Sequence, residues 1–182
     1  GIIAVLSLNK DKTINMLLDG LKQLQNRGYD SAGVCTINNH AFSLVKHAST
    51  KDLNSIQKIE LNKEKLSISN IGIAHTRWAT HGGKTDENSH PHVSFNNKVA
   101  LVHNGIIENY SSLKLNLENE GITFKSQTDT EVISNLIAFN YDKLGDFTQA
   151  INESIKIMSG TWGLAIMNLD EPNKLYCIRH GS

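Results

Sequence analysis

The sequence predicts an α+β fold, because the strands and helices that it indicates come in groups. Most expected strands of the first half lie between residues 32 and 102, with one surface helix among them, and three helices follow one another from about 109 to 158. A last pair of strands closes the chain across a turn at 170–173. Such grouping favours layers of sheet and helix over an alternating parallel sheet.

Length and composition indicate one globular unit. The chain has 182 residues, enough for one domain with a substantial core and short for two. Its 18 basic residues balance 18 acidic ones, which gives no electrostatic reason to expect a nucleic acid as partner. No apolar run approaches the roughly 20 residues of a membrane helix, and the first residues carry no basic segment of a signal sequence. We therefore expect a soluble, cytoplasmic protein that binds neither membranes nor nucleic acid.

The individual elements follow from the periodicity of apolar residues. Short β-branched runs predict strands, apolar residues at helical spacing predict helices, and Gly, Asn or Pro mark their ends. The expected strands lie at 1–6, 32–36, 41–45, 71–74, 99–102, 161–167 and 175–178. The expected helices lie at 13–25, within 51–65, from 109 or 111 to 121, from 128 or 129 onward, and at 147–158.

For some segments the sequence also predicts burial, a turn or a loop. The opening strand is apolar throughout, which predicts burial on both faces and places the first residues inside the fold. Asn38 and Asn39 favour a hairpin turn, and the apolar-poor segment 82–97 is expected to be loop. Cys35 and Cys177 each lie in an apolar context, so we expect two inert, buried thiols and no disulfide framework.

Three polar segments predict a binding site. The densest is His-Thr-Arg-Trp-Ala-Thr-His-Gly at 75–82, and the polar runs 27–33 and 103–105 also adjoin apolar segments. Together they predict one site built from several loops. The Arg77 guanidinium favours a carboxylate or phosphate, because its planar fork matches either group bidentately, whereas the alternative is a solvated cation stacked on Trp78.

The local pattern leaves further alternatives open. The histidines of one short stretch, His75, His81, His90, His92 and His103, raise the question of a metal. Their spacing contains no His-Glu-x-x-His helix, so we expect none.

Two other features also have two interpretations each. Asp129 is either a helix N-cap or a ligand group, and Asn104 with Gly105 forms either an ordinary turn or part of the site.

The motifs taken together resemble a known family. They resemble, in order, the glutaminase domain of the glutamine:fructose-6-phosphate amidotransferases, which are class II glutamine amidotransferases. The motifs lie at 27–33, 75–82, 90–92, 103–109 and 128–131. The resemblance covers nearly the whole chain and implies the N-terminal nucleophile hydrolase fold, a four-layer αββα sandwich of two antiparallel sheets.

The resemblance also implies a reaction that needs no cofactor. In this family an N-terminal cysteine attacks the side-chain amide of L-glutamine, with its own α-amine as the base. A glutamyl thioester forms, ammonia leaves and water releases glutamate. The ammonia converts fructose 6-phosphate to glucosamine 6-phosphate on sugar-phosphate isomerase domains, in an enzyme that we expect to be a homo-oligomer.

Catalytic roles carry over to three positions of this sequence. By resemblance, the Asn104 side-chain amide and the Gly105 backbone N–H form the oxyanion hole. Arg27 lies near the nucleophile.

The resemblance also assigns substrate-binding residues. Arg77 binds the glutamine α-carboxylate, with Thr80 and His81 beside it. Asp129 accepts from the α-ammonium, and Trp78 belongs to a loop that closes over the amide.

Two departures from the family qualify these expectations. The chain begins Gly1-Ile2 where the family begins Cys-Gly-Ile, and it stops at Ser182 where the family continues. We therefore expect residues 1–182 to form a glutaminase domain that is incomplete at both ends, without isomerase domains, and inactive as written. The alternatives are a non-catalytic glutamine-binding or regulatory module and the glutaminase domain of another class II amidotransferase.

Overall fold

A computed structural model describes residues 1–38, 41–79 and 82–181. It contains two four-stranded antiparallel sheets that pack face to face. The first sheet has the order β1-β4-β2-β3, formed by Ile2–Leu6, Ile71–Arg77, Ser31–Asn38 and Ala41–Ala48. The second has the order β5-β6-β7-β8, formed by His92–Val93, Val99–Ile107, Gly160–Asn168 and Leu175–His180.

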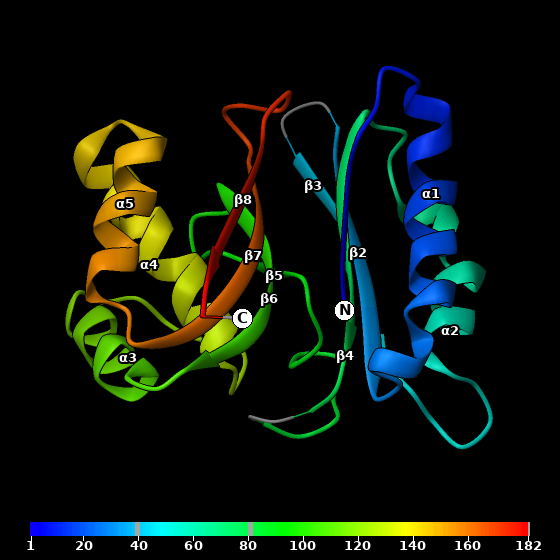
Figure 1. Cartoon of the computed structure of the whole chain (residues 1–182), viewed down its shortest axis with the longest axis horizontal. Helices are drawn as coiled ribbons and strands as arrows, with labels where there is room; N and C mark the ends of the chain where they lie inside the picture. The colour runs from blue at the N-terminus through cyan, green and yellow to red at the C-terminus, as the bar shows by residue number, and fades with distance from the viewer. Residues whose placement is uncertain (39–40, 80–81, 182) are drawn as a thin grey trace.

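Helices cover the two outer faces, which gives the expected order of helix, sheet, sheet and helix (Figure 1). The first sheet carries α1 (Lys10–Gln23) and α2 (Ser55–Leu61), and the second carries α3 (Tyr110–Asn119), α4 (Asp129–Leu144) and α5 (Phe147–Ile157). Short 3-10 turns follow α1 and α2 at Gln25–Arg27 and Lys63–Lys65. The predicted α+β class and the four-layer sandwich are confirmed.

Apolar side chains form three clusters, one beneath each helical layer and one between the sheets. On β4, Ile73 lies in the cluster between the sheets and Ala74 in the cluster beneath α1. Side chains alternate along a strand, so His75 is turned toward the second sheet. On β6, Val102 lies between the sheets, so Asn104 is turned toward the first. Alternation therefore brings the two polar motifs face to face.

The predicted strands after the first are longer than the sequence indicates. The pairing of β4 continues to Arg77, opposite Ser31, and β6 continues to Ile107, opposite Gly160. The motifs expected in loops after these strands therefore begin within the strands. The segment expected to be loop at 82–97 also contains the short strand β5.

Three other expectations are wrong in detail. The opening strand is only partly buried, because β1 is an edge strand of its sheet. The first helix begins at Lys10, since the Asn9 side chain accepts from Asp11 N–H and caps it earlier than expected. Cys177 is exposed on the edge strand β8, whereas Cys35 is buried. Asn39 of the predicted hairpin turn lies outside the described residues, although β2 and β3 do pair as expected.

In the part of the chain that the structure describes, no helix has the length and hydrophobicity of a membrane span.

Gly33 provides a test of how tightly the fold holds the segment before β5. A Cβ atom on Gly33 would lie 2.1 Å from the His90 carbonyl oxygen and 2.6 Å from Lys46 Cβ. We expect Gly33→Ala to lower the free energy of unfolding by about 3 kcal/mol or more, because backbone must move. Gly83→Ala is the control, since its nearest atom would be 3.8 Å away. Urea unfolding measures both, and equal stability of the two variants would contradict this packing.

Candidate active site

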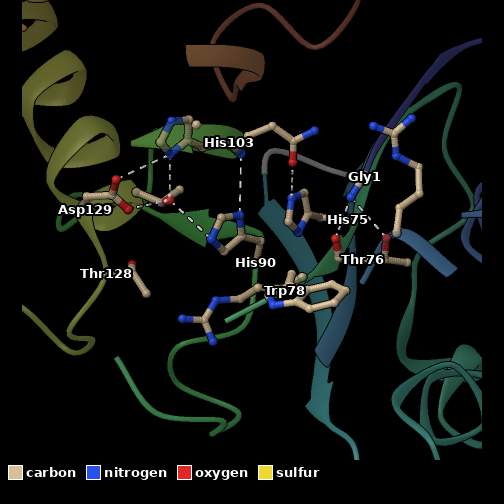
Figure 2. Close-up of a pocket in the computed structure, with 13 residues that line it drawn as sticks. Gly1, His75, Thr76, Trp78, His90, His103, Thr128 and Asp129 are labelled. Atoms are coloured by element: carbon tan, nitrogen blue, oxygen red, sulfur yellow. Dashed lines mark hydrogen bonds and ion pairs between the residues drawn. The ribbon is translucent and has the colours of Figure 1, made fainter. Parts of the chain in front are cut away.

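A cavity of about 140 Å³ opens between the ends of the two sheets and the start of α4 (Figure 2). It gathers six of the eight predicted site residues, namely Arg27, Arg77, Trp78, Asn104, Gly105 and Asp129. The other two, Thr80 and His81, lie outside the described residues. The remaining lining residues are Gly1, His75, Thr76, His90, His103, Thr128 and Thr130.

The first residue of the chain lies in this cavity. The Gly1 α-amine donates to the Thr76 carbonyl oxygen at 2.6 Å and to Thr76 Oγ1 at 3.1 Å, and Thr76 N–H donates back to the Gly1 carbonyl at 2.9 Å. Thr76 Oγ1 in turn donates to the Leu24 carbonyl at 3.2 Å. Burial, together with the charge of Arg27, lowers the pKa of the amine to about 6. The chain's leading end is thus fixed inside the site.

Arg77 lines the cavity and is only 4% exposed. Its Nη1 donates to the Gly83 carbonyl at 3.2 Å and its Nη2 to the Gly82 carbonyl at 3.5 Å. The guanidinium therefore supports the loop that follows β4. Burial lowers the pKa of Arg77, and the charges of Asp30 and Asp129 oppose that shift.

Asp30 contacts the same loop at two residues. Its carboxylate accepts from Ala79 N–H at 3.0 Å and pairs with Lys84 Nζ at 2.5 Å. Burial alone would raise the pKa of Asp30, but these hydrogen bonds and the nearby cations outweigh it and lower the pKa. Trp78, at the start of the loop, is 59% exposed and meets the Tyr29 ring edge-on, with centroids 5.4 Å apart.

Asp129 lies across the cavity from Gly1 (Figure 2). It is the first residue of α4, whose N-cap is Thr128, because Thr128 Oγ1 accepts from Glu131 N–H. Asp129 is therefore not the N-cap, and its carboxylate is available for other contacts. It accepts from Ile107 N–H at 3.0 Å and lies 3.9 Å from His103 Nδ1.

Buried histidines and threonines form a hydrogen-bonded cluster in the wall of the cavity. Thr130 Oγ1 contacts His90 Nε2 at 3.2 Å and His103 Nδ1 at 3.1 Å, and Thr128 Oγ1 contacts His92 Nε2 at 3.0 Å. Burial lowers the pKa of His90 and of His92 well below the usual value, so these rings are neutral at neutral pH.

The sequence predictions did not assign a role to this cluster. The available signal was the concentration of histidines between residues 75 and 103, which raised only the question of a metal. Among the described residues, no group of three or more His, Cys, Asp or Glu side chains is arranged to hold a metal ion.

Comparison with known protein families identifies the family of this chain. A family model described as a glutamine amidotransferase domain matches residues 75–181, more than half of the chain. The chain belongs to the glutamine amidotransferase family.

Curated relatives of this amidotransferase domain match almost all of it. The glutamine–fructose-6-phosphate aminotransferase (isomerizing) of Clostridium perfringens is 43% identical over 96% of the chain, and that of Buchnera aphidicola is 44% identical over all of it. The chain spans only 28% and 29% of the length of these relatives.

Solved structures of amidotransferases have the same fold. An allosteric regulatory enzyme of purine biosynthesis superposes with a TM-score of 0.75, and a glutamine phosphoribosylpyrophosphate amidotransferase from B. subtilis with a TM-score of 0.69. Each is 28% identical, and each comparison covers 92% of this chain and 35% of the other. The amidotransferase domain thus has the N-terminal nucleophile hydrolase fold that the resemblance implied.

Proposed function

We propose that this domain hydrolyses the side-chain amide of glutamine, and that its parent protein uses the ammonia to convert fructose 6-phosphate to glucosamine 6-phosphate. The observation that carries the proposal is a single cavity lined by Gly1, Arg77, Asn104 and Asp129. The names of the relatives, at 43% and 44% identity, supply the acceptor sugar. The rest of such a parent would hold the sugar-phosphate isomerase domains and form a homo-oligomer.

The proposed binding mode uses the opposite charges of the cavity. Glutamine carries an α-carboxylate and an α-ammonium, which would pair with Arg77 and Asp129 respectively. Thr80 and His81 would bind beside Arg77, and Trp78 would belong to a loop that closes over the side-chain amide. The side-chain amide would then extend toward the end of β1 where Gly1 lies.

The proposed chemistry needs a thiol just ahead of Gly1. A cysteine there would attack the amide carbon, with its α-amine taking the thiol proton, while Arg27 lies beside that amine. The Asn104 side-chain amide and Gly105 N–H would stabilise the oxyanion until ammonia leaves, and water would then cleave the thioester. Neither Cys35 nor Cys177 lines the cavity.

Extending the chain tests this proposal. We expect the printed 182 residues to bind glutamine without turnover, and the same chain with Cys directly before Gly1 to release glutamate and ammonia in equal amounts. Serine at that added position is the matched control and should abolish release. A folded cysteine-bearing chain that releases no glutamate would overturn the proposal.

The same experiment separates the alternative of a non-catalytic glutamine-binding module. Calorimetry on the two chains would then show glutamine binding in both and turnover in neither. A glutaminase that serves another acceptor would release glutamate from the cysteine-bearing chain, while its parent would form no glucosamine 6-phosphate.

A further inference from the structure

One hydrogen bond joins the two sheets inside the cavity. His75 Nε2 of β4 lies 2.8 Å from Asn104 Oδ1 of β6. Both side chains are turned into the space between the sheets by strand alternation, and both line the cavity. The contact therefore fixes how the Asn104 amide is oriented in the site.

The chemistry of the two groups determines where the proton lies. Asn104 Oδ1 is a carbonyl oxygen and can only accept, so His75 Nε2 must donate. Burial lowers the pKa of His75 to about 3, and the ring is 3% exposed, so it is neutral and carries one N–H. Its Nδ1 has no hydrogen-bond partner among residues 1–38, 41–79 and 82–181. The contact to Asn104 thus selects the Nε2–H tautomer.

A second contact, to one face of the ring, holds the imidazole in place. It stacks on His90 with ring centroids 4.3 Å apart and an angle of 24° between the planes. His90 contacts Thr130 Oγ1 at the start of α4 through its Nε2, at 3.2 Å (Figure 2). His75 therefore has a fixed ring plane as well as a fixed tautomer, and an amide bonded to it has little freedom to rotate.

We propose that His75 is a positioning residue, which binds Asn104 Oδ1 and so turns the Asn104 NH₂ toward the carbonyl oxygen of the amide being cleaved. An amide group is planar, so when its oxygen is held on one side, its two N–H donors face the other. Without the His75 donor, the amide could rotate and present an oxygen to the developing oxyanion, which would repel it. This inference rests on the proposed glutaminase activity.

Two substitutions separate positioning from packing in the chain that carries Cys before Gly1. His75→Phe keeps an aromatic ring against His90 but loses the donor, and we expect kcat for glutamate release to fall roughly tenfold to a hundredfold. KM for glutamine should stay the same, because Arg77 and Asp129 are unchanged. His75→Gln can place a donor near the original Nε2 position and should keep most of kcat. His180→Phe, an exposed histidine that stacks on Trp162 outside the cavity, is the matched control.

A double-mutant cycle sharpens the assignment. If His75 acts through Asn104, then His75→Phe should cost almost nothing in kcat once Asn104 is already alanine. An equal loss in both backgrounds would overturn the proposal, and so would a His75→Phe chain with the parent kcat. A loss of activity that His75→Gln does not restore would overturn it as well.

The tautomer of His75 can be measured on the 182-residue chain, and the measurement does not require enzymatic activity. Nitrogen-15 spectra that correlate ring nitrogens with ring protons distinguish Nε2–H from Nδ1–H, and we expect His75 in the Nε2–H form at pH 7. An Nδ1–H or doubly protonated ring would overturn the inference. The two proposals therefore fail separately: a cysteine-bearing chain without glutamate release refutes the glutaminase, whereas the wrong tautomer or an uncoupled double mutant refutes the role of His75.

Discussion

Asn104→Ala should lower kcat for glutamate release by about a hundredfold to a thousandfold in the chain that carries Cys before Gly1. This is the typical effect of losing one oxyanion-hole donor, because the donor acts only on charge that develops in the transition state. KM should change little, since the groups proposed to bind the α-carboxylate and α-ammonium, Arg77 and Asp129, lie on other elements. Steady-state release of glutamate measures both constants.

The outcome of this substitution distinguishes chemistry from binding. Asn116→Ala, on an exposed position of α3, is the matched control and should leave kcat at the parent value. Calorimetry on Asn104→Ala should still show glutamine bound with the affinity of the parent. A variant with unchanged kcat would remove Asn104 from the oxyanion hole, and a loss confined to KM would make it a binding residue instead.

The sequence predicted the fold class well, because apolar periodicity records which face of an element is buried. α3 and α5 begin and end close to the expected residues, and α4 begins at one of the two expected residues. Thr128 caps α4 and Gly121 follows the end of α3, although the Asn109 side chain makes no cap hydrogen bond at the start of α3. Apolar periodicity did not predict that β4 pairs with β2. It joins residues some forty positions apart, as in His75 opposite Gly33, and local sequence carries no information about that register.

The candidate site was predicted largely from motifs that resemble the family, and its local geometry was misjudged for a physical reason. Polar residues at 75 and 77 suggest that a strand has ended, because strands in a core are usually apolar. Here the strand continues, and its inward side chains meet other polar groups across the gap between the sheets. His75 therefore finds Asn104 at 2.8 Å, a contact that depends on the packing of two sheets and leaves no local pattern.

The neutral histidines lead to the second large prediction, which concerns stability in acid. Unfolded histidine titrates near pH 6.5, whereas burial lowers the pKa of His75 to about 3 and those of His90 and His92 well below 6.5. Below pH 6.5 the unfolded chain binds protons that the folded chain does not, so stability is lost as the pH falls. Three such groups give a slope of roughly 4 kcal/mol per pH unit near pH 5.

Near pH 5 the three imidazoles contribute more to this slope than the other groups with shifted pKa values. The Gly1 α-amine, with its pKa lowered from 8.0 to about 6, contributes mainly between those two values and is charged in both states below them. Asp30, Asp86 and Asp142 also have lowered pKa values, but an unfolded aspartate binds a proton only near pH 4. Glu171 has a lowered pKa as well, and its unfolded form, which titrates near pH 4.5, adds only a fraction of a proton at pH 5. Between pH 4.5 and 5.5 unfolding should therefore take up about three protons.

Urea unfolding at closely spaced pH values measures that uptake. Because a typical domain is stable by only about 5–15 kcal/mol, a loss of roughly 4 kcal/mol in one pH unit should bring the domain close to unfolding near pH 5. His92→Gln keeps a group that can bond to Thr128 Oγ1 but cannot titrate, so its slope should be smaller by about 1.4 kcal/mol per pH unit. A parent slope no steeper than that of one proton would mean that the buried rings become charged in the folded state, which would contradict the neutral form of these histidines.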